Sequence, residues 1–349
     1  MDLERFDPAA DAGAARACHD IYLAAARADE QRRPPMSARV FRSWLTFGWT
    51  EDPAELWLAH RGASRACGFY QLSLPARENR NLAELTPVVH PAHRRGGLGT
   101  ALVAHAAARA RQARRTTLTA HADEASAGEA FARALGASYR MTGVFPVLRL
   151  DSVPAGHLAA LRARAESASP GYSLLTWEGA TPEEQLDAAA ALYQAEEDAP
   201  RPAGEETQRW DRGRVRADDR RIADQGKRFY TVAARPEPGG ELVAITQLGV
   251  DPARPDWAIQ ELTAVARPHR GHRLGLRVKV AMLGLLAGRE PQVSSILTHN
   301  AGGNEHMIAI NEQLGFEVLE RQTSWTLGIT RAPTFADLAA PGGAASAQP

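Results

Sequence analysis

The chain lacks several features that would reveal a function class directly. Its 41 Lys and Arg residues balance its 41 Asp and Glu residues, so it has no excess positive charge of the kind that nucleic-acid-binding proteins carry. Only two cysteines are present, Cys18 and Cys67, which excludes a zinc site built from thiolates alone and favours a reducing, cytoplasmic environment. The longest apolar stretch, residues 278–287, contains Lys279 and is too short to cross a bilayer. We therefore expect no nucleic-acid partner and no membrane segment.

One sequence pattern occurs twice in the 349 residues, a length that suits two domains. The stretch ELTPVVHPAHRRGGLG at 84–99 is repeated as ELTAVARPHRGHRLG at 261–275, and Arg94 and Gly99 recur 176 positions later as Arg270 and Gly275. A second pair of landmarks follows, with ALGA at 134–137 and QLGF at 313–316. The chain is therefore expected to contain two copies of one domain.

This repeat predicts an N-terminal domain at 1–150, a connector at 151–171, a C-terminal domain at 172–330 and a disordered tail at 331–349. In the second copy, β-branched runs at 228–234 and 241–250 flank a Pro/Gly turn and predict a hairpin. A strand at 257–265 leads into the repeated loop. Helices at 274–286 and 305–314, with strands at 294–297 and 318–327, complete the copy. The predicted fold class is α/β with a mixed sheet.

Each repeated loop is expected to follow a strand and to precede a helix, which is an arrangement suited to phosphate. The pattern Arg-x-x-Gly-x-Gly aims free backbone N–H groups and the helix dipole at one point, and the arginines add positive charge. Neither loop ends in the Gly-Lys-Ser/Thr of a P-loop. Neither has the third glycine of a dinucleotide-binding fingerprint, because Leu102 and Val278 stand there.

The loops and the helix that follows them resemble the acyl-CoA-binding core of the GCN5-related N-acetyltransferase (GNAT) family. Residues 88–99 and 265–275 match its Val-x-x-Pro-x-x-Arg-x-x-Gly-x-Gly motif loosely, and residues 300–316 resemble its next helix. Because both copies match, the chain resembles tandem, two-domain GNAT proteins of actinobacterial type. The resemblance implies two tandem acyl-CoA N-acyltransferase folds and acetyl-CoA as co-substrate, with no metal. It also implies direct attack by the amine of a small molecule in a ternary complex.

The resemblance further assigns residues that contact acetyl-CoA. The loop would bind the pyrophosphate, Asn304 would bind the pantetheine, and a backbone N–H within residues 263–266 would polarise the thioester carbonyl. The assigned residues of the second copy are Val265, Ala266, Arg270, Gly271, His272, Arg273, Leu274, Gly275 and Asn304. Those of the first copy are Val89, Arg94, Arg95, Gly96, Gly97, Gly99 and Thr100.

Each copy departs from the family pattern in its own way. In the second copy, Arg273 replaces the first glycine, and one residue fewer separates the proline from the arginine, a difference that a β-bulge would absorb. Asn311 is an expected catalytic position, and it stands where many family members have a tyrosine that protonates the leaving thiolate. Because an amide is a poor acid, another group or solvent would supply this proton, or the thiolate would leave unassisted. The first copy has Ala125 and Ala132 at the asparagine and tyrosine positions. We therefore predict a degenerate N-terminal domain and a catalytic C-terminal domain.

Three groups of residues are candidates for proton transfer and acceptor binding. Glu261 lies on the central strand, where only one of Gln260 and Glu261 can face the cleft because side chains alternate. His299 ends the next strand and is either a base or a tether for the loop 301–304. The acids Glu196, Glu197 and Asp198 follow the early helix and either line the acceptor site, where they would suit a cationic amine, or form a solvated helix end.

Two further functions and two assembly states stay open. The chain could be a non-catalytic CoA-binding sensor, or it could transfer the acyl group to a hydroxyl or thiol. It could act as a monomer or a homodimer. The paired histidines at 90 and 93 and at 269 and 272 have no third ligand nearby, which favours contacts within the loops or to phosphate over a metal.

Overall fold

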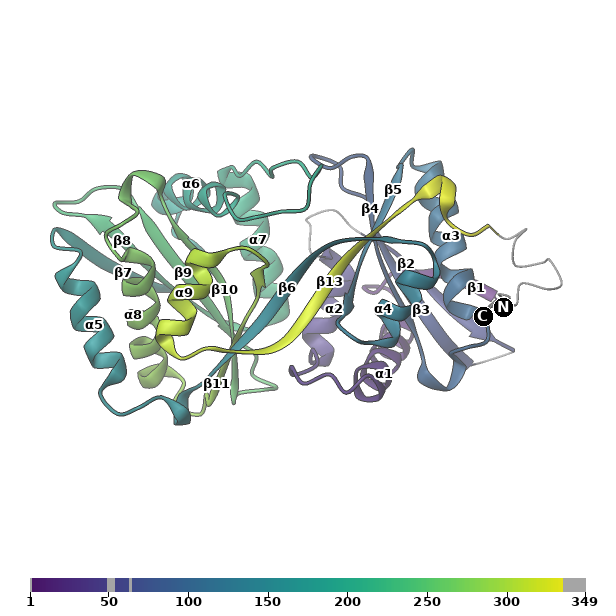
Figure 1. The fold of residues 1–349 in the computed structure, drawn as a ribbon, viewed down its shortest axis with the longest axis horizontal. Coiled ribbons are helices and arrows are strands. Elements are labelled where there is room, and N and C mark those ends of the chain that lie inside the picture. Colours follow the sequence, from purple (N-terminus) through teal and green to yellow (C-terminus); the bar gives the residue numbers. More distant parts are fainter. Residues whose placement is uncertain (1, 49–53, 63–64, 335–349) are drawn as a thin grey trace, which may run out of the picture. The chain divides into compact units, whose positions relative to one another are not determined.

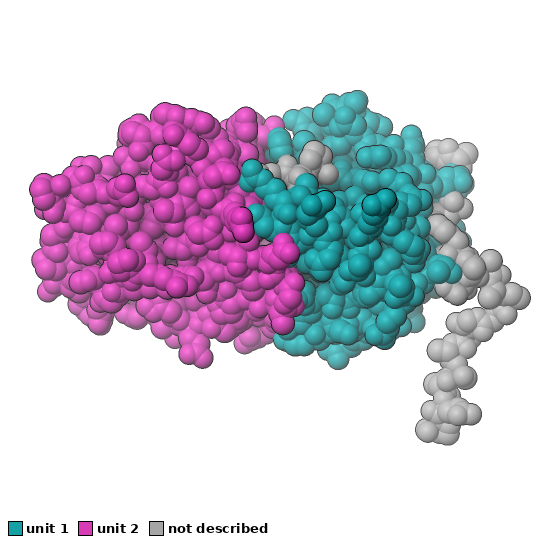
Figure 2. All heavy atoms as spheres, turned by 90° about the horizontal axis from the view of Figure 1, so that it is seen from above, with its two compact units in different colours: residues 1–31, 41–140, 323–349 teal, residues 32–40, 141–322 magenta. Residues whose placement is uncertain are grey.

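The computed structural model describes residues 2–48, 54–62 and 65–334, which fall into two compact units. Unit 1 takes the described residues of 1–31, 41–140 and 323–349, and unit 2 takes residues 32–40 and 141–322 (Figure 2). Each unit combines a mixed β-sheet with helices (Figure 1). The α/β class with a mixed sheet is therefore confirmed. None of the helices in the described ranges is long and apolar enough to span a bilayer.

Unit 1 has helices on both faces of its sheet. The strand order is β1–β2–β3–β4–β5, followed by residues 323–328 of β13, and β4 and β5 run parallel. On β3, Phe69 packs edge-on against Phe41 of α2, whereas Tyr70 points the other way and hydrogen bonds to His105 of α3. The elements are β1 (Asp2–Phe6), α1 (Ala12–Ala28), α2 (Ala38–Phe47), β2 (Glu55–Arg61), β3 (Arg65–Ser73), β4 (Leu82–Val89), α3 (Leu98–Gln112), β5 (Thr117–Asp123) and α4 (Ala127–Ala134).

Unit 2 repeats this arrangement with one additional helix. The strand order is β6–β11–β10–β9–β8–β7, and β10 and β11 run parallel. On β8, Ala233 packs against α6, whereas Val232 faces the core formed with α5 and α8. The elements are β6 (Ser138–Arg149), α5 (His157–Ser167), β7 (Tyr172–Glu178), α6 (Leu186–Glu196), α7 (Arg212–Gln225), β8 (Arg228–Pro236), β9 (Ala244–Val250), β10 (Trp257–Val265), α8 (Leu274–Arg289), β11 (Ser295–Thr298), β12 (Asn300–Ala301), α9 (Glu305–Leu314) and β13 (Glu317–Gly328).

The two units exchange their last strands. β6 comes from the first repeat, but its residues 141–149 belong to unit 2, where Val147 to Arg149 pair with β11. β13 comes from the second repeat, but residues 323–328 belong to unit 1, where Thr323 Oγ1 donates to the Ala122 carbonyl at 3.0 Å. The unit boundaries therefore differ from the domain boundaries expected at residues 150 and 330. A repeat shows which residues recur, but strand pairing between distant segments is set by the tertiary fold.

The segments expected to be a connector and a tail also contribute structure. Residues 151–171 contain α5, and its Leu161 and Ala165 pack in the same core as α8. In the expected tail, Arg331 ends a short 3-10 turn and Ala332 is buried. Residues 335–349 of that segment lie outside the described residues.

Candidate functional site

A parallel strand pair separates at the same place in each unit. The pairing of β10 with β11 covers Trp257–Gln260 and ends at the Gln260–Thr298 pair, whereas β10 continues to Val265. In unit 1, the pairing of β4 with β5 ends at Glu84 and Thr119, and β4 continues to Val89. Backbone groups at the carboxyl ends of these central strands thus lie beside an opening, where α/β sheets bind ligands.

The expected β-bulge is present in β10. Between Gln260 and Thr263 this strand advances three residues, while its partner β9 advances two, from Leu248 to Thr246. In unit 1, β4 pairs with β3 without a shift from Glu84 to Val89. The bulge therefore distinguishes unit 2 from unit 1 at the strand expected to hold the thioester.

A buried polar network lies at the bulge. It shows that Gln260, rather than Glu261, has the buried side chain. Gln260 Nε2 donates to the Gln247 carbonyl at 2.6 Å and to Thr246 Oγ1 at 2.8 Å. Thr246 Oγ1 lies 2.7 Å from Thr263 Oγ1. Tyr193 of α6 donates to Gln247 Oε1 at 2.8 Å. Gln260 is therefore a buried structural residue.

Glu261 takes no part in this network and pairs with Lys227 at 3.0 Å. Desolvation opposes ionisation of Glu261, but the positive charges of Lys227 and Arg221 outweigh it and lower the pKa of the carboxyl. About a third of the Glu261 side chain, 35%, is exposed. The residue is thus an ionised, accessible carboxylate directly beside the bulge.

The loop of unit 2 presents unpaired backbone donors at the start of α8. Gly271 and Arg273 have left-handed backbone, with φ of 88° and 54°, and Arg273 supplies no side-chain cap. The first α-helical hydrogen bond runs from the Arg277 N–H to the Arg273 carbonyl at 2.9 Å. The N–H groups of Leu274, Gly275 and the next residue therefore have no acceptor within the helix. Such a helix start suits a diphosphate.

The loop of unit 1 has the same backbone with its side chains interchanged. Arg95 and Gly97 have φ of 63° and 80°, at the positions that match Gly271 and Arg273. Gly97 begins α3 without a side-chain cap. Gly96 and Thr100 lie on either side of this helix start. Each loop therefore places one glycine and one arginine at its two left-handed positions.

The last glycine of each motif is required by helix packing. A Cβ atom on Gly275 would lie 3.2 Å from Ile310 of α9, and one on Gly99 would lie 3.3 Å from Phe131 of α4. Ile310 and Phe131 occupy equivalent places in the two repeats. These glycines let α8 and α3 approach their neighbouring helices.

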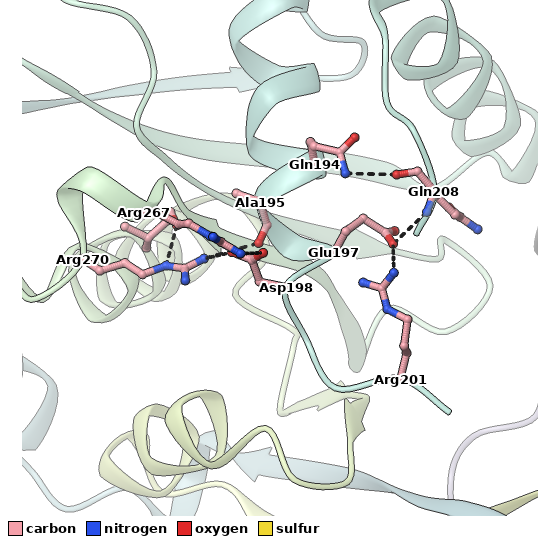
Figure 3. A network of polar contacts seen from close by, with 9 residues as sticks. Gln194, Ala195, Glu197, Asp198, Arg201, Gln208, Arg267 and Arg270 are labelled. Carbon is pink, nitrogen blue, oxygen red and sulfur yellow. Dashed lines mark hydrogen bonds and ion pairs between the residues drawn. The ribbon is translucent and has the colours of Figure 1, made fainter. Parts of the chain in front are cut away.

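The arginine that opens each motif is held by the protein itself (Figure 3). Arg270 donates from Nε to the Val265 carbonyl at 3.1 Å and from its guanidinium to Asp198 at 2.8 Å, and Arg267 binds the same carboxylate. In unit 1, Arg94 donates from Nε to the Val89 carbonyl at 3.3 Å and to both oxygens of Asp29 at 2.6 and 2.8 Å.

The three acids that follow α6 have different surroundings (Figure 3). Hydrogen bonds from Arg267 and Arg270 hold the pKa of Asp198 far below its usual range. Glu197 accepts from the backbone N–H of Gln208 at 3.1 Å and pairs with Arg201 at 3.3 Å. Desolvation and the nearby charge of Glu197 raise the pKa of Glu196. Asp198 and Glu197 therefore organise the segment after α6, and Glu196 has the least stabilised carboxylate of the three.

The residues expected after β11 lie around α9. Asn304 caps α9 by accepting from the Met307 N–H at 3.3 Å. Asn311 is buried and donates to Asn300 Oδ1 at 2.8 Å, while its own Oδ1 has no hydrogen-bond partner. His299 lies against the Phe145 ring, with 4.8 Å between ring centroids. An amide that joins α9 to β12 therefore stands at the expected tyrosine position.

The remaining expected contacts are structural in several cases. The Ala266 N–H donates to the Val243 carbonyl at 2.9 Å, and the Leu274 side chain is buried. The Nδ1 atom of His269 is hydrogen bonded to the Tyr172 hydroxyl, 2.9 Å away. The centroids of the His272 and Tyr172 rings are 5.7 Å apart. Within the described ranges, no group of three or more His, Cys, Asp and Glu side chains could hold a metal ion.

Asp29 is the residue that the sequence analysis missed. It ends α1 as Asp198 follows α6, and both acids bind the first arginine of a loop. A signal was available, because each early helix is followed by an aspartate near the same point of the repeat. Without the structure, such an acid is indistinguishable from a solvated helix end.

Comparisons with known proteins agree with the repeated architecture. The profile of the acetyltransferase (GNAT) family matches residues 16–137. A solved tandem GNAT protein from the clavulanic acid biosynthesis pathway is 29% identical, with coverage of 94% of this chain and 98% of that chain and a TM-score of 0.77. No curated protein matches significantly.

More distant solved structures support the fold alone. A GCN5-related N-acetyltransferase from Sphaerobacter thermophilus is 17% identical over 95% of this chain and 96% of that chain, with a TM-score of 0.66. A putative acetyltransferase from Pyrococcus horikoshii is 14% identical over 94% and 89% of the two chains, with a TM-score of 0.53. The chain therefore has the fold of tandem GNAT proteins, and its residues 16–137 match the acetyltransferase (GNAT) family.

Proposed function

We propose that the chain is an acyl-CoA-dependent N-acetyltransferase whose unit 2 transfers an acetyl group from acetyl-CoA to the amine of a small molecule. The observation that carries the proposal is the coincidence of three features at one end of unit 2. These are the separation of β10 from β11 after Gln260, the bulge before Thr263, and the uncapped start of α8. Unit 1 has the separated strands and the uncapped helix, but its β4 has no bulge between Glu84 and Val89.

The residues at this end of unit 2 fit acetyl-CoA by their chemistry. The N–H groups at 274–276 suit a diphosphate, because a helix start combines free donors with the positive end of the dipole. When bound, acetyl-CoA supplies the acyl group as a thioester. Since the Ala266 N–H already binds Val243, we assign polarisation of the thioester carbonyl to the backbone of residues 263–265.

The proposed reaction balances without a metal. The cationic amine first gives one proton to a carboxylate, and the neutral nitrogen then bonds to the carbonyl carbon as the C–S bond breaks. The proton that the acylated nitrogen loses passes to solvent. CoA leaves as a thiolate and takes its proton from solvent, because Asn311 is an amide and cannot serve as an acid. The hydrogen bond from Asn311 to Asn300 instead holds α9 against β12. This chemistry suits a cytoplasmic protein, as the cysteine content predicts.

We assign the two proton-related roles to Glu261 and Glu196. Glu261 is ionised beside the bulge and accepts the proton, whereas Glu196 at the end of α6 binds the cationic amine. Replacing Glu261→Gln is expected to lower kcat about 10²-fold or more. Glu196→Gln is expected to raise the KM for the amine. Steady-state kinetics with an amine found by screening measure kcat and KM for both variants. If Glu196→Gln lowers kcat and Glu261→Gln raises KM, the two roles are exchanged.

A matched pair of substitutions tests the proposed donor site. His272→Glu and Gly96→Glu each add one negative charge at equivalent, exposed loop positions. A Cβ atom on Gly96 would meet only the end of the Arg61 side chain, at 3.9 Å. Calorimetric titration is expected to show that His272→Glu weakens acetyl-CoA binding at least about 10-fold, a loss that one repelled charge-assisted contact can produce. The Gly96→Glu variant is expected to keep the affinity of unit 2.

Two outcomes would contradict the assignment. Loss of acetyl-CoA binding only in Gly96→Glu would place the donor site in unit 1. Binding by unit 2 without turnover of any amine would favour a CoA-binding sensor, and a product that carries an ester or thioester would indicate a hydroxyl or thiol acceptor.

A further inference from the structure

In both repeats, the same two kinds of contact join the first arginine of the phosphate loop to the strand that enters the loop and to the end of the first helix. In each, the first arginine of the motif donates from Nε to the carbonyl five residues earlier, Val265 or Val89. In each, the guanidinium also binds the aspartate that follows the first helix. The flanking positions differ, with Gly271 and Arg273 in one loop and Arg95 and Gly97 in the other. The connection is therefore reproduced while its surroundings vary.

The aspartate of unit 2 belongs to a segment that is closed on itself (Figure 3). Gln194 Nε2 donates to the Gln208 carbonyl at 3.0 Å, and Gln194 Oε1 accepts from the Trp210 N–H at 3.1 Å. Glu197 accepts from the Gln208 N–H. Residues 196–211 are here called the acceptor segment. The segment begins at the end of α6, and hydrogen bonds made by Gln208 and Trp210 bring its other end back to the same place. Asp198 connects this segment to the loop.

These contacts favour one of two roles for Arg270. As a phosphate ligand it could use only its remaining N–H groups, because Nε donates to the Val265 carbonyl and Nη2 donates to Asp198. As a connector it needs no change on ligand binding. The second role also explains why Nε is committed to the Val265 carbonyl on the strand that enters the loop.

We propose that Arg270 is a positioning residue that couples acyl-CoA binding at the loop to the acceptor segment through Asp198. The proposal rests on the proposed function of unit 2. Occupation of the loop fixes the backbone around residues 270–276, and the Arg270–Asp198 pair passes this restraint to residues 196–211. By linkage, an amine bound at the acceptor segment raises the affinity for acyl-CoA by the same factor.

Hydrogen exchange with and without acetyl-CoA tests the coupling in the full chain. In the wild type, acetyl-CoA is expected to slow exchange at 270–276 and also at 196–211. In Asp198→Asn, Arg270→Gln and the double variant, the slowing at 196–211 is expected to be lost to the same extent. The double variant should add nothing, because both single substitutions break one connection.

Matched controls separate this role from general destabilisation and from phosphate binding. Arg267→Gln leaves the Arg270–Asp198 pair in place, and Asp29→Asn breaks only the equivalent pair of unit 1, so both should keep the wild-type slowing at 196–211. Arg270→Gln and Asp198→Asn should change the acetyl-CoA Kd equally and by less than about 3-fold. A phosphate ligand would instead lose about 10-fold or more in Arg270→Gln alone.

Three results would overturn the proposal. These are slowing at 196–211 that persists in Arg270→Gln, additive effects in the double variant, or a Kd loss confined to Arg270→Gln. If acetyl-CoA protects nothing in the wild type, the proposed function of unit 2 fails instead. The connector is then tested without ligand, where exchange at 196–211 must rise in Asp198→Asn and Arg270→Gln and must not rise further in the double variant.

Discussion

Lys279 is one of only two lysines in the chain, and it lies inside the core of unit 2. It is 2% exposed, and its Nζ lies 5.4 Å from the centre of the Phe316 ring. Desolvation lowers its pKa to about 7. The first repeat has Val103 at the equivalent position. An apolar side chain thus fills this site in the same fold, and the buried amine costs unit 2 stability near neutral pH.

The pH dependence of unfolding follows from this shift. Between pH 7 and about 10.4, the ordinary lysine pKa, the unfolded chain carries a proton that the native Lys279 lacks, so stability rises with pH. Below pH 7 both states are protonated and the slope from this group vanishes. Lys279→Met is expected to be more stable than the wild type at pH 7, and the difference should shrink as pH rises toward 10. Urea unfolding at several pH values measures it, and a constant difference would contradict the buried amine.

Individual residues show where sequence reasoning reaches its limit. The loop motif predicted arginines and glycines at a helix start, and the structure places them there. It did not predict that Gly275 makes room for Ile310 or that Arg270 binds Asp198. Both facts depend on partners 35 and 72 positions away in the sequence, which a local motif does not contain.

At the scale of elements, the sequence predicted those with local signals. Asn304 and Gly315 bound α9 with a side-chain cap and a left-handed turn, so the expected helix at 305–314 is confirmed. The expected hairpin is confirmed as β8 and β9, which pair antiparallel. The bulge in β10 was expected from one missing residue between the proline and the arginine of the second motif. The spacing between two motif residues therefore located a backbone feature that hydrophobic patterns do not show.

The element-scale surprise is the destination of β6 and β13. A strand was expected at 318–327 as the last element of the second repeat, yet residues 323–328 of β13 belong to unit 1. Pairing is instead decided by which neighbouring strand is available, with β11 beside β6 and β5 beside β13. Periodicity predicts that a segment is a strand, but it carries no information about its partner.

At the scale of the whole molecule, the exchange predicts how fragments behave. A fragment of residues 1–150 has β5 but lacks residues 323–328, and an unpaired strand edge promotes association. We expect this fragment to elute as oligomers in size-exclusion chromatography. Joining residues 323–334 through a flexible linker after residue 140 is expected to restore a monomer that unfolds cooperatively in urea. A monomeric, cooperatively folding 1–150 fragment would show that unit 1 does not need the exchanged strand.

The exchanged strand also ties unit 1 to the direction of protein synthesis. The ribosome releases β1 to β5 before the elements of unit 2, but the strand that lies beside β5 is encoded after α9. Throughout the intervening translation, β5 keeps an open row of hydrogen-bonding groups. The first repeat to emerge is therefore completed only after the second repeat has been synthesised, and a nascent chain arrested before residue 323 carries an unprotected sheet edge.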